Sequence, residues 1–316
     1  MAGLALASPL VARAETYPSR PISMIVPFPA GGATDVLARA LSKRMQESLG
    51  QPIVIENIAG AAGTIAVGRF VRMPADGYTL SIGTSTTHML TGGLYSLPFD
   101  LLNDIDPVIM IGSEPLLIVT KKDFPASNLK ELIAWLKDNP DKASVGIAGI
   151  GATGHLTGIA LQKATSTKFQ FVPYRGNGPA MQDLLAGQID FQIEPASNFQ
   201  AQVSAGNLKA IAVTSEKRMS TFPDTPTTDE AGLPNFVTSL WYGLWVPKGT
   251  PTDIIVKINA TMRETLADPA LEERLGELGI EPTPPELQSP EALSKYQRAE
   301  AAKWWPLIKA AEIKGQ

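Results

Sequence analysis

Short runs of apolar and β-branched residues alternate with stretches of helical periodicity along most of the chain. The run Ile22–Val26 predicts a first strand, and an apolar face with helical spacing then predicts a helix that ends before Gly50 and Pro52. Further strands are expected at 53–55 and 79–82. A second series is expected at 116–119, 145–147, 169–172, 189–193 and 208–213. This alternation predicts α/β architecture with doubly wound, parallel sheets.

Capping residues support several of the expected helices. Ser127 is the expected N-cap of a helix that Pro140 ends. Pro179 suits a first helical turn, and Gly187 suits a C-terminal cap with positive φ. Ser289 and Pro290 open a long amphipathic helix near the end of the chain.

Two connections divide the 316-residue chain, which is longer than one ordinary core requires. The first covers 104–114, where one strand series gives way to the next. The second is the Pro-rich segment 221–234, followed by the apolar run 240–246. We therefore expect one domain from 15–112 and 237–316 and a second from 113–236. Two crossing strands would join these domains, with a cleft between them.

The first 14 residues have the pattern of a signal-peptide remnant. An apolar run precedes Ala12-Arg13-Ala14, which matches the small-x-small pattern of a signal-peptidase site, so Glu15 is the expected first mature residue. The usual basic start of a signal peptide is missing, and an ordinary apolar segment is the alternative. No later apolar stretch reaches the ~18 residues that a membrane span needs. The sequence thus predicts a soluble, exported protein.

Composition excludes several classes of function. The net charge is −4 and no basic run is present, which argues against nucleic acid and membrane-surface binding. The sequence has no cysteine, so disulfides, thiolate metal sites and cysteine nucleophiles are excluded.

A glycine-rich turn, 27–35, follows the first expected strand. Helix N-termini beyond the carboxyl ends of strands bind anions, and glycines let the backbone approach a ligand closely. The candidate ligand-binding residues here are Phe28, Pro29, Ala30, Gly31, Gly32 and Asp35. The turn is not a P-loop, because no Lys-Ser/Thr follows the glycines. A merely tight turn between strand and helix is the alternative.

Gly149–Gly154 reads G-x-G-x-x-G between an expected strand and an expected helix. Such glycines can seat a dinucleotide pyrophosphate. The next strand ends in Tyr174 and Arg175 rather than an acid, so an NADP-dependent oxidoreductase is the rival reading. The mid-chain position and the predicted export both argue against it.

Further candidates follow other strand ends. Tyr174, Arg175, Gly176, Asn177 and Gly178 form a third glycine-rich turn that opens a helix. Ser85 and Thr86 supply hydroxyl groups, and Ala152, Thr153, Gly154 and His155 open another helix. Glu194 ends the strand at 189–193 and is able to meet an amine or hydroxyl of a ligand; a solvated loop acid is the alternative.

The two histidines, His88 and His155, both follow strand ends. Without an HExxH motif or paired carboxylates they do not make a metal site. A hydrolase that uses Ser85 and His155 is conceivable, although G-x-S-x-G is absent and no orienting acid is marked.

Several segments together resemble a known family. They include Tyr17-Pro-Ser-Arg-Pro-Ile22, the turn 26–35, Ala75-Asp-Gly-Tyr78, Val172 to Ala180, Gly187-Gln-Ile-Asp190 and Val246-Pro-Lys-Gly-Thr-Pro251, in family order through the mature chain. The chain resembles the Bug-type receptors, the extracytoplasmic solute-binding components of tripartite tricarboxylate transporters.

This resemblance implies a two-lobed periplasmic-binding-protein fold of type II. It also implies a periplasmic receptor, expected to be a monomer without cofactor or metal, that delivers a small organic carboxylate to an inner-membrane permease. In such receptors the turns at 28–32 and 174–178 hold one end of the ligand, and Ser85, Thr86 and 152–155 line the rest. Relatives often carry Asp where this chain has Glu194, which leaves the identity of the carboxylate open.

Overall fold

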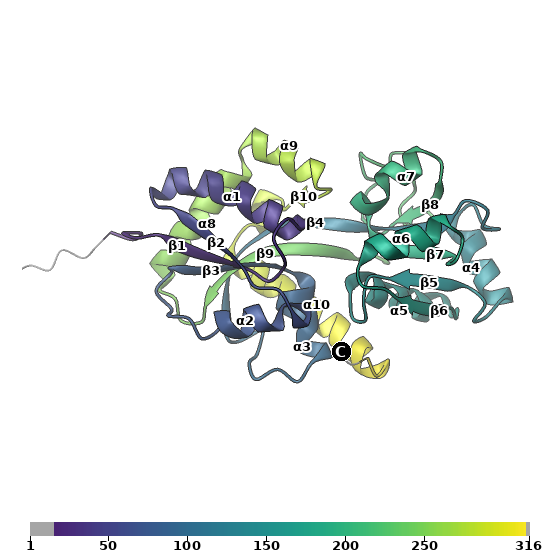
Figure 1. Cartoon of the computed structure of the whole chain (residues 1–316), viewed down its shortest axis with the longest axis horizontal. Helices are drawn as coiled ribbons and strands as arrows, with labels where there is room; N and C mark the ends of the chain where they lie inside the picture. The colour runs from purple at the N-terminus through teal and green to yellow at the C-terminus, as the bar shows by residue number, and fades with distance from the viewer. Residues whose placement is uncertain (1–15, 314–316) are drawn as a thin grey trace, which may run out of the picture.

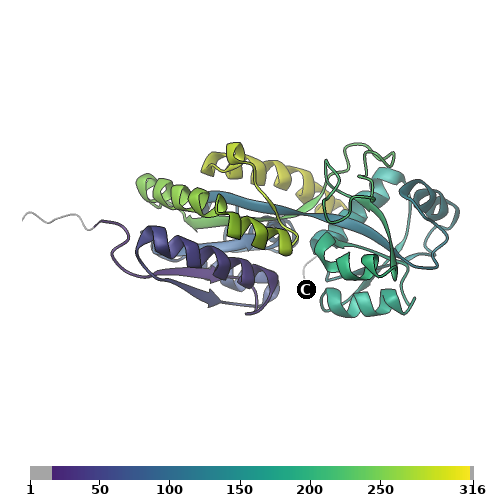
Figure 2. The same cartoon turned by 90° about the horizontal axis from the view of Figure 1, so that it is seen from above.

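The computed structural model describes residues 16–313, so the predicted signal-peptide remnant, 1–14, lies outside the described residues. The described chain forms two α/β lobes, which two long strands connect (Figure 1). The strands are β4 (Ile105–Lys121) and β9 (Ser239–Pro247). Viewed from above, β4 runs from one lobe into the other (Figure 2). The predicted two-lobed fold with two crossing strands is confirmed.

The first lobe combines the start and the end of the chain. Its elements are β1 (Ile22–Val26), α1 (Ala33–Leu49), β2 (Ile53–Asn57), α2 (Thr64–Phe70), β3 (Thr79–Thr84), α3 (Thr91–Leu94), α8 (Thr252–Leu266), α9 (Pro269–Glu277), β10 (Glu281–Pro282) and α10 (Pro290–Ala310). A short π-helix, Thr86–Leu90, precedes α3.

The second lobe is built from the middle of the chain. Its elements are α4 (Leu129–Asp138), β5 (Ser144–Ile147), α5 (Thr153–Thr165), β6 (Gln170–Pro173), α6 (Asn177–Leu185), β7 (Phe191–Pro195), α7 (Gln200–Ser204) and β8 (Leu208–Val213).

The strands follow the order β2-β1-β3-β9-β4-β7-β5-β6, and β8 and β10 also pair with β4. Strands β1, β2 and β3 pair in parallel, as do β5, β6 and β7. The crossing strands pair antiparallel with each other and with their neighbours β3, β7 and β8. The expected parallel pairing is therefore found within each lobe, whereas the crossing strands at the centre pair antiparallel, which was not predicted. One strand leaves the first lobe and the other returns to it, so the two run in opposite directions.

Apolar clusters fill both faces of the sheet in each lobe. In the first lobe, α1, α8 and α9 cover one face, and α2, α3 and α10 cover the other. In the second lobe, α4 and α5 pack on one face and α6 and α7 on the other. Helices on both faces explain why strands such as β1 are apolar almost throughout.

The residues that begin and end the helices are mostly those expected. Gly50 and Gly187 have φ of 69° and 75°, and Ser289 caps α10 by accepting a hydrogen bond from Ala292 N at 3.1 Å. The prediction that Ser127 caps α4 is wrong by one residue. Asn128 is the cap and accepts from Glu131 N at 2.9 Å, while Glu131 accepts from Ser127 N at 2.8 Å. Glu131 therefore bonds the residue before the cap instead of the cap itself, so both candidates take part in the start of α4.

Candidate functional site

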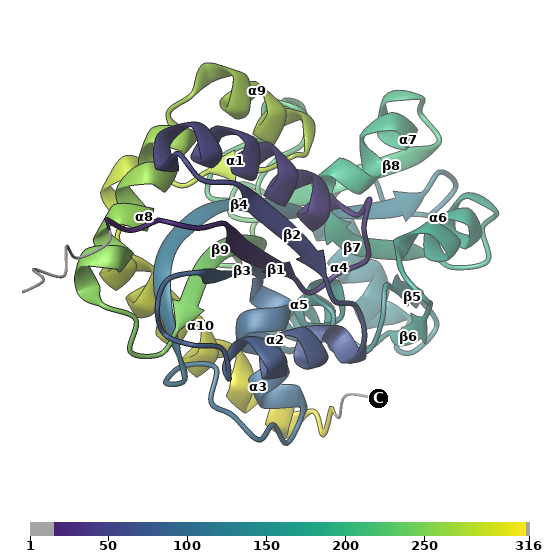
Figure 3. The same ribbon diagram turned by 60° about the vertical axis from the view of Figure 1, so that its left-hand side comes forward.

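A cavity of about 370 Å³ opens between the lobes. It is lined from both lobes and from β9, by Phe28, Pro29, Gly32, Ala33, Thr34, Thr84, Thr86, Ala152, Thr153, Glu194, Pro195, Leu240 and Tyr242. The N-terminal end of α1 points toward the second lobe, which brings the turn before it to this cavity (Figure 3). The position agrees with the rule that α/β sheets bind ligands beyond the carboxyl ends of their strands.

Asp35 determines the shape of the turn between β1 and α1. Its carboxylate is 2% exposed and accepts hydrogen bonds from Gly31 N at 2.8 Å, Arg39 Nε at 3.0 Å and Asn57 Nδ2 at 3.0 Å. The bond from Arg39, helped by those from Gly31 and Asn57, lowers the pKa of Asp35 to about 2 against the effect of burial. Asp35 is thus engaged within the protein and organises the turn.

The start of α1 forms part of the cavity wall, and of its amides Gly32 N donates to Pro29 O at 3.4 Å. Gly32 is the N-cap and supplies no side-chain capping bond, and the first N–H groups of a helix have no partner within it. Gly32, Ala33 and Thr34 all line the cavity. Because a helix N-terminus carries a partial positive charge, this wall suits a carboxylate.

The opposite wall begins with the N-terminus of α5. Ala152, its N-cap, and Thr153 line the cavity, and Thr153 Oγ1 lies 3.2 Å from Thr86 Oγ1 of the first lobe. This contact between hydroxyl groups joins the two lobes beside the cavity. The structure therefore brings the predicted segments around Thr86 and Ala152 together with the opening turn.

Glu194 lies at the end of β7, against the first turn of α5. A Cβ at Gly154 would lie 2.1 Å from Ile193 O and 2.7 Å from Glu194 Oε1, so only glycine fits there. Glu194 is 5% exposed, and its Oε1 accepts from Ala148 N at 3.2 Å. Burial, followed by the charge of Glu114, raises the pKa of Glu194 to about 7.

Glu114 is a second buried acid, on the crossing strand β4. It accepts hydrogen bonds from Ser197 Oγ and, at 3.4 Å, from Tyr242 OH. Burial raises its pKa to about 7 as well. A carboxyl group therefore lies in the connection between the lobes, and its hydrogen bonds join β4 to β9 and to the segment after β7.

The predicted turn 174–178 is not among the residues that line the cavity. Tyr174 OH donates to Asp183 Oδ2 at 2.7 Å, and Asn177 Oδ1 accepts from Gln192 Nε2 at 3.2 Å. Arg175 and Gly178 are exposed. In this structure the turn thus stands apart from the opening turn, although Gly176, with φ of 101°, does begin α6 as expected.

Ser85 and the two histidines are packed into the protein. Ser85 is 2% exposed, and the cavity is lined by its neighbours Thr84 and Thr86 instead. His88 is fully buried, stacks on Trp245 with ring centroids 4.1 Å apart, and bonds Ser81 at 3.0 Å. Burial lowers its pKa to about 3.

His155 has a structural role too. Its Nδ1 accepts from Gly151 N at 3.0 Å, and its ring meets the edge of Phe171 at 4.6 Å between centroids. Burial lowers its pKa to about 4, so it is neutral at physiological pH. Ser85 and His155 are both buried and neither lines the cavity, so the geometry gives no support to a hydrolase.

Sequence reasoning missed several residues that line the cavity. They are Ala33, Thr34, Thr84, Pro195, Leu240 and Tyr242. Thr34 and Thr84 adjoin predicted site residues, so a wider window around each strand end would have found them. Leu240 and Tyr242 lie on β9, and only the fold shows that this crossing strand passes the cavity.

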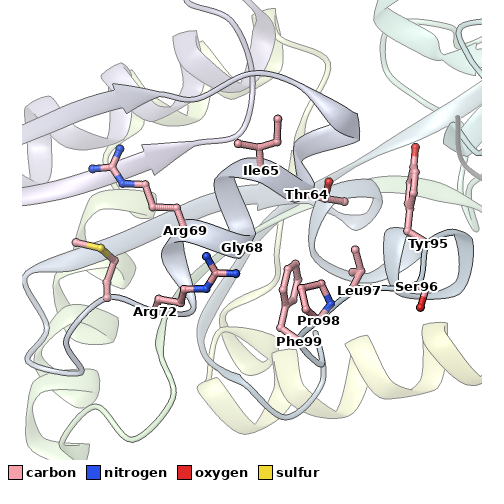
Figure 4. A pocket seen from close by; sticks show the side chains of 11 residues that line it. Thr64, Ile65, Gly68, Arg69, Arg72, Tyr95, Ser96, Leu97, Pro98 and Phe99 are labelled. Carbon is pink, nitrogen blue, oxygen red and sulfur yellow. The ribbon is translucent and has the colours of Figure 1, made fainter.

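A larger hollow of about 700 Å³ lies between α2 and the segment after α3 (Figure 4). It is lined from the first lobe alone. Arg69 at its edge pairs with Glu56 at 2.9 Å, and a Cβ at Gly68 would lie 3.1 Å from Phe99. We regard it as a packing seam, because none of its lining residues comes from the second lobe or the predicted site.

Within residues 16–313, no group of three or more His, Asp or Glu side chains is arranged to hold a metal ion. Over the same residues, no helix has the length and apolar character needed to cross a membrane.

Two α/β lobes, two crossing strands and a cavity lined from both lobes define a solute-binding protein of the periplasmic binding class. The sequence profile described as "Tripartite tricarboxylate transporter family receptor" matches residues 37–313, and the chain belongs to this family. The family consists of solute-binding receptors and not enzymes, so the NADP-dependent oxidoreductase reading of Gly149–Gly154 is wrong.

Individual relatives resemble this chain over nearly its whole length. The protein BugT of Bordetella pertussis is 37% identical over 303 residues, which cover 95% of this chain and 92% of BugT. The structure of the periplasmic binding protein BugD is 39% identical with a TM-score of 0.78, over 95% of this chain and 100% of BugD. MatC from Rhodopseudomonas palustris, solved with bound malate, is 34% identical with a TM-score of 0.79, over 92% of this chain and 100% of MatC.

Proposed function

We propose that this protein is a periplasmic receptor that captures a small organic carboxylate in the cavity between its lobes. The observation that carries the proposal is the start of α1 in the cavity wall, where Ala33 and Thr34 line the cavity and the first helical N–H groups have no partner within the helix. The malate bound to the related MatC supports the ligand class.

The proposal includes closure of the lobes on the ligand. The turn 174–178 stands outside the cavity with its exposed Arg175, and bending at β4 and β9 would carry it toward the turn 28–32. Ligand would favour the closed state by contacting both turns at once. The moving bodies would be residues 15–112 with 237–316, and residues 113–236.

Family membership supports export and delivery. We expect the receptor to act in the periplasm as a monomer and to present its ligand to a tripartite tricarboxylate permease in the inner membrane. Delivery to a signalling sensor is the alternative.

A thermal-shift screen of the purified protein against mono-, di- and tricarboxylates tests this function. A ligand at 100 times its Kd stabilises the folded state by about 2.7 kcal/mol, and the midpoint rises accordingly. The variant designed to block carboxylate binding is Gly32→Val. Gly32 has φ of −76°, and a Cβ there meets only Pro29 O at 3.5 Å, so the variant should fold. Gly31 is less suitable, since its φ of 85° strains any side chain.

The control variant is Gly276→Val, at an exposed position in α9 where a Cβ meets nothing within 4 Å. We expect a carboxylate to raise the midpoint of the wild type and of Gly276→Val but not of Gly32→Val. A screen in which no carboxylate shifts the wild type would refute the function.

A further inference from the structure

The walls of the interlobe cavity differ in electrostatic character. The first lobe presents the N-terminus of α1, with its partial positive charge. Asp35 in the first turn of that helix is paired with Arg39 at 3.0 Å, so the pair adds no net charge to this wall. A ligand carboxylate is therefore drawn toward Ala33 and Thr34.

The second lobe presents a carboxyl group. Glu194 lines the cavity and lies against the first turn of α5, where the distance from Gly154 leaves no space for a side chain. An acid beside a helix N-terminus offsets the positive charge of that terminus. The start of α5 is thus a poorer place than the start of α1 for a ligand carboxylate.

Protein cations are lacking at this end of the cavity. None of the residues that line it is a lysine or an arginine, and none of the ion pairs found among residues 16–313 includes Glu194. Its one hydrogen-bond donor is Ala148 N. A buried carboxyl group with so few partners stays ionised favourably only when a cation joins it, and otherwise it takes up a proton. The ligand is the remaining source of that cation.

We infer that the ligand is a small zwitterionic amino carboxylate, with its carboxylate at the start of α1 and its ammonium group at Glu194. The inference rests on the proposed function and adds the group at the far end of the ligand. A dicarboxylate would place a second negative charge beside Glu194.

The pH dependence of binding provides a signature. The titratable groups around Glu194 are Glu114 on β4, Tyr242 on β9, which bonds Glu114, and His155 on α5. His155 has a pKa of about 4, and burial raises the pKa of Tyr242, so between pH 5.5 and 8 only the two glutamates titrate among them.

The ammonium group requires ionised Glu194, so affinity rises with pH. With a pKa of about 7 in the free protein, the affinity for an amino carboxylate should fall on the order of thirty-fold from pH 8 to pH 5.5. Binding of a dicarboxylate, which needs the protonated acid, would change in the opposite direction.

Calorimetry with matched ligands tests the inference. The probes are α-amino acids and ω-amino acids of three to five carbons, compared with the mono- and dicarboxylates of equal length. We expect an amino carboxylate to bind the wild type at pH 8 at least tenfold more tightly than its matched acids. Glu194→Gln should lose that preference and the pH dependence, whereas Glu114→Gln should keep the preference.

Two results would overturn the inference while leaving the receptor function intact. One is a dicarboxylate that binds more tightly than every amino carboxylate and weakens as the pH rises. The other is an amino carboxylate whose affinity Glu194→Gln leaves unchanged, with folding of the variant verified by its unfolding midpoint. If no carboxylate of any kind binds, the proposed function itself fails and this inference fails with it.

Discussion

Among single residues, Asp35 has the most defined structural task, since three donors from separate positions converge on its carboxylate. Asp35→Ala leaves the donors of Gly31 and Asn57 without their acceptor. We expect it to lower the free energy of unfolding in urea by about 1–3 kcal/mol. The control is Arg39→Ala, which removes one partly exposed donor and should cost at most about 1 kcal/mol. Equal losses in the two variants would contradict this role.

The buried acids predict how stability depends on pH. Burial raises the folded-state pKa of Glu114 and of Glu194 from 4.5 to about 7, so the folded protein binds more protons than the unfolded chain between these values. The contribution of each group to stability is therefore largest below about pH 4.5 and is lost as the pH rises to about 7.

Unfolding of Glu114→Gln and Glu194→Gln across this window measures the effect. Each variant should lose less stability than the wild type between pH 4.5 and 7, by about 1–3 kcal/mol. Wild-type and variant curves that run parallel would show that neither group is protonated on folding.

The candidate site illustrates what residue patterns predict and what they do not. The turn 28–32 was predicted because glycines between a strand and a helix indicate a ligand-binding turn without any knowledge of the fold. The hydrogen bond from Gly31 N to the Asp35 carboxylate was not predicted, because the side chain of the third residue of a helix is equally able to face solvent. Its direction depends on Asn57, which the fold of β2 brings close.

At the scale of elements, the start of α5 fits closely against the end of β7. Gly154→Ala places a Cβ against the main chain at Ile193 and should destabilise the protein by about 1–3 kcal/mol. Gly178→Ala occupies the same position, the second residue, in α6, where a Cβ meets nothing within 4 Å, and should be neutral or slightly stabilising. Thermal unfolding of both variants checks this contact. Similar midpoints would mean that α5 and β7 move apart easily.

The elements themselves were largely predictable, since β1 and β8 have the expected bounds and most other strands differ by a few residues. The segment 104–114 was expected as a connection, and most of it belongs to β4. Pro107 and Pro115 interrupt the strand pattern there. Pro107 lies where the pairing of β4 with β9 shifts register, and Pro115 lies opposite Ser239 at the end of that pairing. Antiparallel pairing at the centre depends on chain direction between lobes, which periodicity does not encode.

At the scale of the whole molecule, the proposed closure bends both crossing strands. We expect small-angle X-ray scattering to show a smaller radius of gyration when a saturating carboxylate is added to the wild type. Gly32→Val should show no such change. A ligand that binds with full occupancy but leaves the scattering curve unchanged would contradict closure.

The two-lobed architecture followed from the two breaks in the strand series and from the family resemblance. A cleft between the lobes was expected too, but its full lining was not, because that lining joins residues from 28 to 242 that only the arrangement of the lobes brings together. That arrangement also decides which predicted residues meet. Thr86 and Thr153 do, while the turn 174–178 stands apart.

The central claim is that the start of α1 holds a carboxylate between the lobes, and calorimetric titration tests it most directly. The wild type and Gly276→Val should bind the carboxylate found by screening with a stoichiometry of one, and Gly32→Val should bind at least a hundredfold more weakly while unfolding at a similar midpoint. Full affinity in Gly32→Val would place the ligand elsewhere and contradict the claim.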